Sequence, residues 1–294
     1  MRQTAKFLGL VSMTALLVPS TGVLAAAPMR ALRASFNRWA YWLAMVAVSA
    51  LFFAIGFGVY GLIALALGVL MGVFAEVEEH GGTAFVAGFT AILASAGVTA
   101  LAGSLWTKAT RTNLLAPIRD SANAFVTRMA ELNQQGVMSA DDVMKHLPSI
   151  FIAALMLALA FALLWSPLIA RLFALSPEPE TQKAPLTRYR VPDIGVWITI
   201  IALFGAFFRH GVVWAQVTSL NILNIVVVAY FFQGLAVITE AFKVYRVGPF
   251  WRAIWYTLIV LQLFLMVSVI GFVDFWVDFR ERLARRPTEP KQSF

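Results

Sequence analysis

The chain has no cysteine and only three histidines in 294 residues, so it lacks the side chains that disulfides and most protein metal sites use. A disulfide framework and a thiolate metal centre are excluded. The histidines His80, His146 and His210 are too scattered in sequence to indicate an imidazole cluster. We therefore expect no metal and no other cofactor.

Charged residues are also scarce, because they make up 13% of the chain, against about a quarter in an ordinary soluble domain. Hydrophobic residues make up 60%, which indicates an all-α polytopic transmembrane helix bundle. The net charge of +8 comes from basic residues at the edges of apolar runs and in the C-terminal tail. In those positions they fix topology and contact lipid headgroups, so we expect a lipid bilayer and no nucleic acid as partner.

Sequence motifs of common enzymes are missing as well, since the chain has no Walker A loop, GxSxG elbow or HExxH sequence. Residues 56–61 match the GxGxxG pattern of dinucleotide-binding folds. That pattern needs a preceding strand, whereas long apolar runs flank it on both sides here. We read it as a break between two helices and expect no enzyme activity.

The first part of the chain predicts four apolar helices. Residues 1–27 form either a first transmembrane helix, which we favour, or a cleaved signal-like segment. Residues 28–112 hold helices 2 to 4, because the apolar run 39–75 is too long for one span and has glycines in its middle. The run lies between a basic connector (Arg30, Arg33 and Arg38) and an acidic loop (Glu76, Glu78 and Glu79).

The pattern changes over residues 113–148, which predict an amphipathic helical segment outside the membrane. Its apolar side chains recur at helical spacing among charged ones, and these are Ile118, Ala122, Phe125, Met129 and Leu132. Ser139 and Asp142 resemble the capped start of a shorter helix. The apolar face has three possible partners, namely the bilayer surface, the protein's own helices or another protein.

Residues 149–279 predict transmembrane helices 5 to 8, with a polar, proline-containing linker at 176–191, and residues 280–294 form a basic tail. The total is about eight helices, or seven if the first is cleaved. The eighth span is expected at 250–272. A bacterial inner membrane with a cytoplasmic C-terminus puts the basic tail and the segment 108–145 inside. The basic connector then lies outside, together with the acidic loop, and opposes this orientation.

The predicted seventh helix, residues 212–246, carries small and polar residues along one arc. Gln233, Gly234 and Glu240 belong to that arc or border it, while Asn221 and Asn224 share a different one. Such a stripe either lets helices pack closely or lines a solute site. Taken alone, these residues favour packing.

Two acids mark the end of the last span, where Asp274 and Asp278 are four residues apart and Arg282 lies one turn further. If the span ends near residue 272, they form a charged ladder at the interface, which is the interpretation we favour. If the helix lies deeper, Asp274 pairs with Arg209 or binds a proton or cationic solute. Lys243 gives Glu240 an i, i+3 partner.

The segments YFFQGLAVITEAFKV (230–244) and GFVDFWVDFRER (271–282) resemble the YybS-like family of uncharacterised bacterial membrane proteins. The resemblance implies a fold related to the S components of energy-coupling-factor transporters. S components bind a vitamin-like solute and couple to a transmembrane subunit with ATPases. An S-component-like bundle is therefore expected.

These observations leave two hypotheses. In the first, the protein is an integral membrane protein that binds or helps to transport a small solute, with a partner membrane subunit or ATPase module. Its ligand-binding residues are then Asn221, Asn224, Gln233, Glu240 and Asp274. In the second, it is a non-transporting scaffold in an envelope or division-related assembly. Four residues have structural or interface roles in both, namely Gly234, Asp278, Arg280 and Arg282.

Overall fold

The computed structural model describes residues 2–113, 115–132, 139–175, 189–208 and 212–284. Throughout these residues the regular structure is helical, which confirms the predicted all-α class. The chain divides into an N-terminal unit, Met1–Lys183, and a C-terminal unit, Ala184–Phe294. The division falls within the predicted linker, of which residues 176–188 lie outside the described residues.

Helices of membrane-spanning character occur in both units. Among the described residues, five helices are long and apolar enough to cross a bilayer, and three shorter ones are also apolar. The five are Gln3–Thr21, Gly58–Glu79, Ala84–Thr110, Leu147–Leu172 and Val213–Val244. Many large apolar side chains on these helices are exposed in the chain, and such side chains are suited to face lipid.

The N-terminal unit runs from α1 (Arg2–Thr21) through the short η1 (Val23–Ala25) to α2 (Ala26–Ser35), and then to α3 (Arg38–Ala54) and α4 (Gly58–Glu79). The glycine-rich break between α3 and α4 occurs where the sequence predicts it. Gly56 adopts a φ of 87°, which glycine tolerates without strain. The two helices then pack closely, and Tyr41 on α3 donates a 2.7 Å hydrogen bond to the Gly68 carbonyl on α4.

The helix α2 lies at the centre of this unit, where every residue from Ala26 to Arg33 is buried. It packs against α8 (Leu147–Leu172), α4 and α1. The prediction that Arg30 and Arg33 belong to a connector between helices is therefore wrong, because both are buried residues of α2. The predicted acidic loop is wrong too, because residues 76–79 form the last turn of α4.

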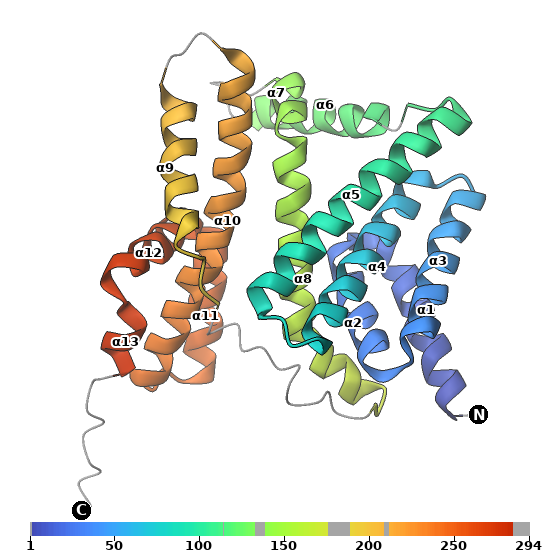
Figure 1. The fold of residues 1–294 in the computed structure, drawn as a ribbon, viewed down its shortest axis with the longest axis horizontal. Helices are drawn as coiled ribbons and strands as arrows, with labels where there is room; N and C mark the ends of the chain where they lie inside the picture. The colour runs from blue at the N-terminus through green and yellow to red at the C-terminus, as the bar shows by residue number, and fades with distance from the viewer. Residues whose placement is uncertain (1, 114, 133–138, 176–188, 209–211, 285–294) are drawn as a thin grey trace, which may run out of the picture. The chain divides into compact units, whose positions relative to one another are not determined.

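The unit is completed by α5 (Ala84–Thr110), α6 (Leu115–Leu132) and α7 (Ala140–Lys145). A capping box starts α7, since Ser139 accepts from the Asp142 backbone N–H and the Asp142 carboxylate accepts from the Ser139 N–H. Figure 1 shows α6 running crosswise to α8, at the end where α8 begins. This placement separates α6 from the helices that could span a bilayer.

The C-terminal unit contains α9 (Ile194–Phe207), α10 (Val213–Val244), α11 (Pro249–Leu261), α12 (Phe264–Val277) and α13 (Phe279–Ala284). The long α10 packs against both α9 and α12. The single eighth span expected at 250–272 is wrong, because the helix ends at Leu261 and restarts at Phe264. At about 1.5 Å per residue, each piece is about 20 Å long and falls short of the bilayer core.

Tertiary contacts explain this break, which no glycine or proline marks. The Tyr256 hydroxyl of α11 lies 2.9 Å from that of Thr239 on α10, and the Tyr256 ring packs edge-on against Phe242. α12 packs on a different part of α10, around Phe231 and Val267. Separate helices satisfy both sets of contacts, so packing overrides the continuous apolar pattern.

Candidate functional site

The C-terminal unit contains a cluster of polar side chains that we call the polar centre, formed by the buried Gln233 and Asp274 and the partly buried Arg280. Gln233 lies on α10 and is 1% exposed. Its amide nitrogen donates to the Asp274 carboxylate at 3.2 Å, and its amide oxygen accepts from the Val191 backbone N–H at 2.8 Å. Both ends of the amide are thus bonded to other parts of the unit.

Asp274, on α12, is also 1% exposed, and its carboxylate has three kinds of donor. Besides Gln233, the Arg280 guanidinium donates twice to Oδ2, at 2.9 and 3.2 Å, and the Phe279 backbone N–H donates to Oδ1 at 2.9 Å. Arg280 also donates to the Tyr189 carbonyl at 2.9 Å. A carboxylate in apolar surroundings needs such compensation, because burying an unpaired charge is very costly.

The turn at Asp278, directly after the last residue of α12, produces this geometry. Asp278 has a φ of 47°, in the left-handed region that Asp tolerates better than most residues, and it ends α12. The chain turns there into α13 and brings Arg280 back to Asp274. The predicted ladder of Asp274, Asp278 and Arg282 is therefore wrong. Asp278 instead forms a 3.2 Å ion pair with Arg190, and Arg282 is exposed.

Two glycines set the spacing of the helices that carry the centre. A Cβ added to Gly234 on α10 would collide with the Val267 carbonyl, and one added to Gly271 on α12 would collide with the Tyr230 carbonyl. Such close backbone approach is what small residues permit between membrane helices. Gln233 directly precedes Gly234, and Asp274 follows Gly271 by about one helical turn. The close approach of the two glycines therefore places Asp274 beside Gln233.

The other predicted ligand residues do not join the centre. Asn221 is half-buried and donates to the Val217 carbonyl at 2.9 Å within α10, and Asn224 is exposed. At about 1.5 Å per residue, Asn221 lies about 18 Å along the helix from Gln233. Glu240 pairs with Lys243 at 2.7 Å, as its spacing predicts. Arg209, the alternative partner for Asp274, lies outside the described residues.

The N-terminal unit has buried ion pairs that the sequence did not identify. Arg30 on α2 pairs with Glu78 of α4 at 3.2 Å, and their side chains are 4% and 6% exposed. Arg33 pairs with Glu79 at 2.7 Å. The predicted orientation puts the basic and acidic segments on one side of the membrane, which is the signal that could have paired them.

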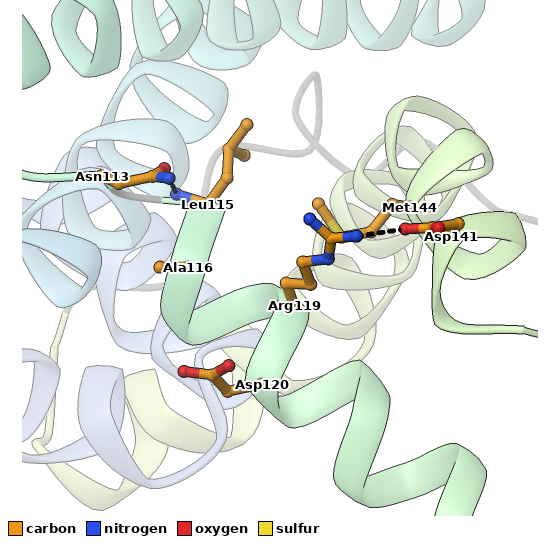
Figure 2. Close-up of a pocket in the computed structure, with 7 residues that line it drawn as sticks. All are labelled: Asn113, Leu115, Ala116, Arg119, Asp120, Asp141 and Met144. Carbon is orange, nitrogen blue, oxygen red and sulfur yellow. Dashed lines mark hydrogen bonds and ion pairs between the residues drawn. The ribbon is translucent and has the colours of Figure 1, made fainter.

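A shallow pocket lies between α6 and α7 (Figure 2), lined by Asn113, Leu115, Ala116, Arg119, Asp120, Asp141 and Met144. Arg119 extends from α6 to Asp141 at 2.6 Å. On the same short α7, the hydrogen bond from Lys145 lowers the pKa of Asp142 to about 2. Within the described residues, no group of three or more His, Asp or Glu side chains could hold a metal ion.

Comparison with known proteins gives one finding. The model of a family described as "Predicted membrane protein (DUF2232)" matches residues 7–275. No curated protein and no solved structure gives a match. The matched residues include both units and the Gln233 and Asp274 side chains of the polar centre.

Proposed function

This chain belongs to the DUF2232 family of predicted membrane proteins, and from that premise we propose that its C-terminal unit binds a small polar solute at the polar centre. Asp274 and Gln233 are the binding groups. In this proposal the protein acts as the substrate-binding subunit of a transporter in the bacterial inner membrane, with its C-terminus in the cytoplasm. It has no catalytic step of its own.

The observation that carries the proposal is the burial of a carboxylate and an amide, beside a partly buried guanidinium, between the apolar helices α10 and α12. Charged groups among membrane helices are costly, so they tend to mark solute or ion sites. Asp274 presents two acceptor oxygens and Gln233 both a donor and an acceptor. Together they suit a solute with a cationic or N–H group.

Arg280 has a definite role in this proposal, because it occupies the position that such a solute would take. Its side chain is 18% exposed, whereas that of Asp274 is 1% exposed, so the guanidinium lies on the outer side of the carboxylate. It is carried by α13, a six-residue helix that follows the left-handed Asp278. Movement of α13 away from α12 would free the carboxylate for the solute.

The resemblance of residues 230–244 and 271–282 to the YybS-like family supports the proposal from a separate direction. Through that family it relates the chain to S components, which work with a membrane subunit and ATPases. A partner membrane subunit or ATPase module is accordingly part of the proposal. The fold alone does not assign the activity.

The second candidate is a non-transporting membrane scaffold. The observation that favours it is that the chain itself already supplies donors to both oxygens of Asp274 and bonds both ends of Gln233. A network satisfied in this way also locks helices together without any ligand. The two candidates predict different fates for a variant in which the network stays folded but loses its charge.

The experiment that separates them is native mass spectrometry of the full-length protein purified in mild detergent. Asp274→Asn removes the charge with little change in shape, and Gln233→Leu removes the amide. Asp278→Asn is the matched control, because it makes the same chemical change outside the centre and Asn also tolerates a positive φ. Melting temperature and elution volume report whether each variant is folded.

Solute binding predicts a small molecule that travels with the wild type and with Asp278→Asn, and that is lost from the folded Asp274→Asn and Gln233→Leu proteins. Equal occupancy in all four proteins overturns Asp274 and Gln233 as the site. If none of the folded proteins carries a small molecule, the scaffold is the better account.

A further inference from the structure

A second surface, on α6, points to a function that does not depend on the polar centre. At about 100° per residue, six apolar side chains of α6 fall within an arc of about 100°. They are Leu115, Ile118, Ala122, Phe125, Val126 and Met129. Asp120, Asn123, Thr127 and Glu131 lie on the opposite side, so the helix is amphipathic over its whole length.

The structure leaves much of this apolar face uncovered. Leu115, Phe125 and Met129 are 52%, 61% and 41% exposed, whereas Ala122 is buried. Among the described residues the main neighbour of α6 is α7, which lies on the flank of the apolar arc where Arg119 reaches Asp141 at 2.6 Å (Figure 2), whereas Phe125 lies at the other edge of the arc. The protein's own helices therefore do not provide the main cover for the Phe125 side.

The position of α6 within its unit indicates what covers that face. The helix starts five residues after α5 ends and lies crosswise to α8 at the end where α8 begins (Figure 1). Five extended residues reach at most about 18 Å, so the start of α6 stays near the end of α5. Because α5 and α8 are both candidate spans, α6 lies at the level where the spans leave the bilayer.

The positions of the charged residues on α6 agree with a location at the bilayer surface. Arg119 and Arg128 fall on the two flanks of the apolar arc, while Asp120 and Glu131 lie near the middle of the polar side. The last turn of α5 adds Lys108. Basic residues at the flanks can extend to phosphate groups while the apolar face enters the acyl region, and the acids stay in water.

We infer that α6 is an interfacial helix that lies in the surface of the phospholipid bilayer, with Phe125 and Met129 inserted at the boundary of headgroups and acyl chains. The helix would then hold the α5 and α8 ends at a fixed depth. The spans that it adjoins also expose large apolar side chains near those ends, Leu105 on α5 and Ile150 on α8, and this favours lipid over a protein partner.

Spin-label accessibility tests this inference in the full-length protein, and the absence of native cysteine makes single-cysteine variants direct to prepare. Phe125→Cys reports the apolar face and Asn123→Cys the polar face of the same turn. Leu101→Cys, at a position 62% exposed on α5, is the reference for a lipid-facing site. Each variant is labelled with a nitroxide and reconstituted in phosphatidylcholine vesicles with a minor share of phosphatidylglycerol.

An interfacial helix predicts that the ratio of oxygen to nickel-complex accessibility is severalfold higher at residue 125 than at residue 123, and lower than at residue 101. Equal ratios at residues 125 and 123 overturn the inference, because both faces are then in water. Low accessibility of residue 125 to both reagents also overturns it, since protein then covers the face. Disulfide formation between two Phe125→Cys chains identifies a second copy as that cover.

Discussion

The contact between Gly234 and Gly271 gives a sharp prediction for the substitution Gly271→Ala. A Cβ at this position would lie 2.7 Å from the Gly234 nitrogen and closer still to the Tyr230 carbonyl oxygen. Both are backbone atoms and cannot rotate away. To restore an ordinary contact of 3.4 Å with the nitrogen alone, α12 has to move away from α10 by about 0.7 Å, and the closer carbonyl oxygen requires a larger movement.

This movement has a cost that can be worked from the structure. The hydrogen bond from Gln233 to Asp274 is 3.2 Å long and would stretch beyond the 3.5 Å at which such bonds are lost. Overpacking costs about 1–3 kcal/mol, and a hydrogen bond to a charged group is worth about 1.5–3 kcal/mol. We expect the free energy of unfolding to fall by roughly 2.5–6 kcal/mol.

The assay is reversible unfolding of the full-length protein in mixed micelles with increasing dodecyl sulfate, followed by circular dichroism. Gly97→Ala is the control, because it makes the same change inside α5 where nothing lies within 4 Å of the added carbon. It should leave stability unchanged or raise it by up to about 1 kcal/mol. If Gly271→Ala unfolds like Gly97→Ala, the close approach of α10 and α12 is not what holds the polar centre together.

Three further predictions concern the ion pairs and the cap. Arg280→Gln should lower the free energy of unfolding by about 3–5 kcal/mol, because it leaves the buried Asp274 carboxylate without its cation. The exposed Arg282 is the control, and Arg282→Gln should change this free energy by less than about 0.5 kcal/mol in the same assay. Glu78→Gln should also lower the free energy of unfolding by about 3–5 kcal/mol, because it removes the negative charge that pairs with the buried Arg30. Glu240→Gln, whose ion pair is partly exposed, should lower it by less than about 1 kcal/mol. Similar losses in the two variants would contradict the idea that burial makes the Arg30–Glu78 pair important. The hydrogen bonds from Lys145 and Ser139 lower the pKa of Asp142, so its stabilising contribution is complete above its ordinary value of 3.8 and is lost as pH falls through about 2. NMR titration of labelled aspartate in micelles should show this midpoint, and a midpoint near 3.8 would contradict the effect of these two hydrogen bonds.

Local sequence signals were enough to predict the features that depend on neighbouring residues. Glycine at position 56 marks the break between α3 and α4, because glycine accepts a positive φ and the apolar run is too long for one span. The capping box at Ser139 and the Glu240–Lys243 pair follow from three-residue spacings. The all-α class follows from apolar runs of helical length.

Features that depend on residues far apart in the sequence were missed, because a local pattern does not show which distant residues will be in contact. The polarity of Arg30 and Arg33 is typical of a connector, and only their partners on α4, 46 to 48 residues away, make burial tolerable. The break at Gln262 has no local signal and results from packing on α10. Gln233 and Asp274 could be selected as buried polar groups, but the role of Arg280 depends on the turn at Asp278, which helical periodicity does not reveal.

The central position of α2 has a consequence for how the protein is made. When residues 26–35 leave the ribosome, their arginines have no acidic partner, because Glu78 and Glu79 are still to be translated. The short helix is also too polar to enter the lipid alone. The N-terminal unit must therefore close around α2 only after α4 has been synthesised and inserted, and a nascent chain halted before residue 78 should remain open at its centre.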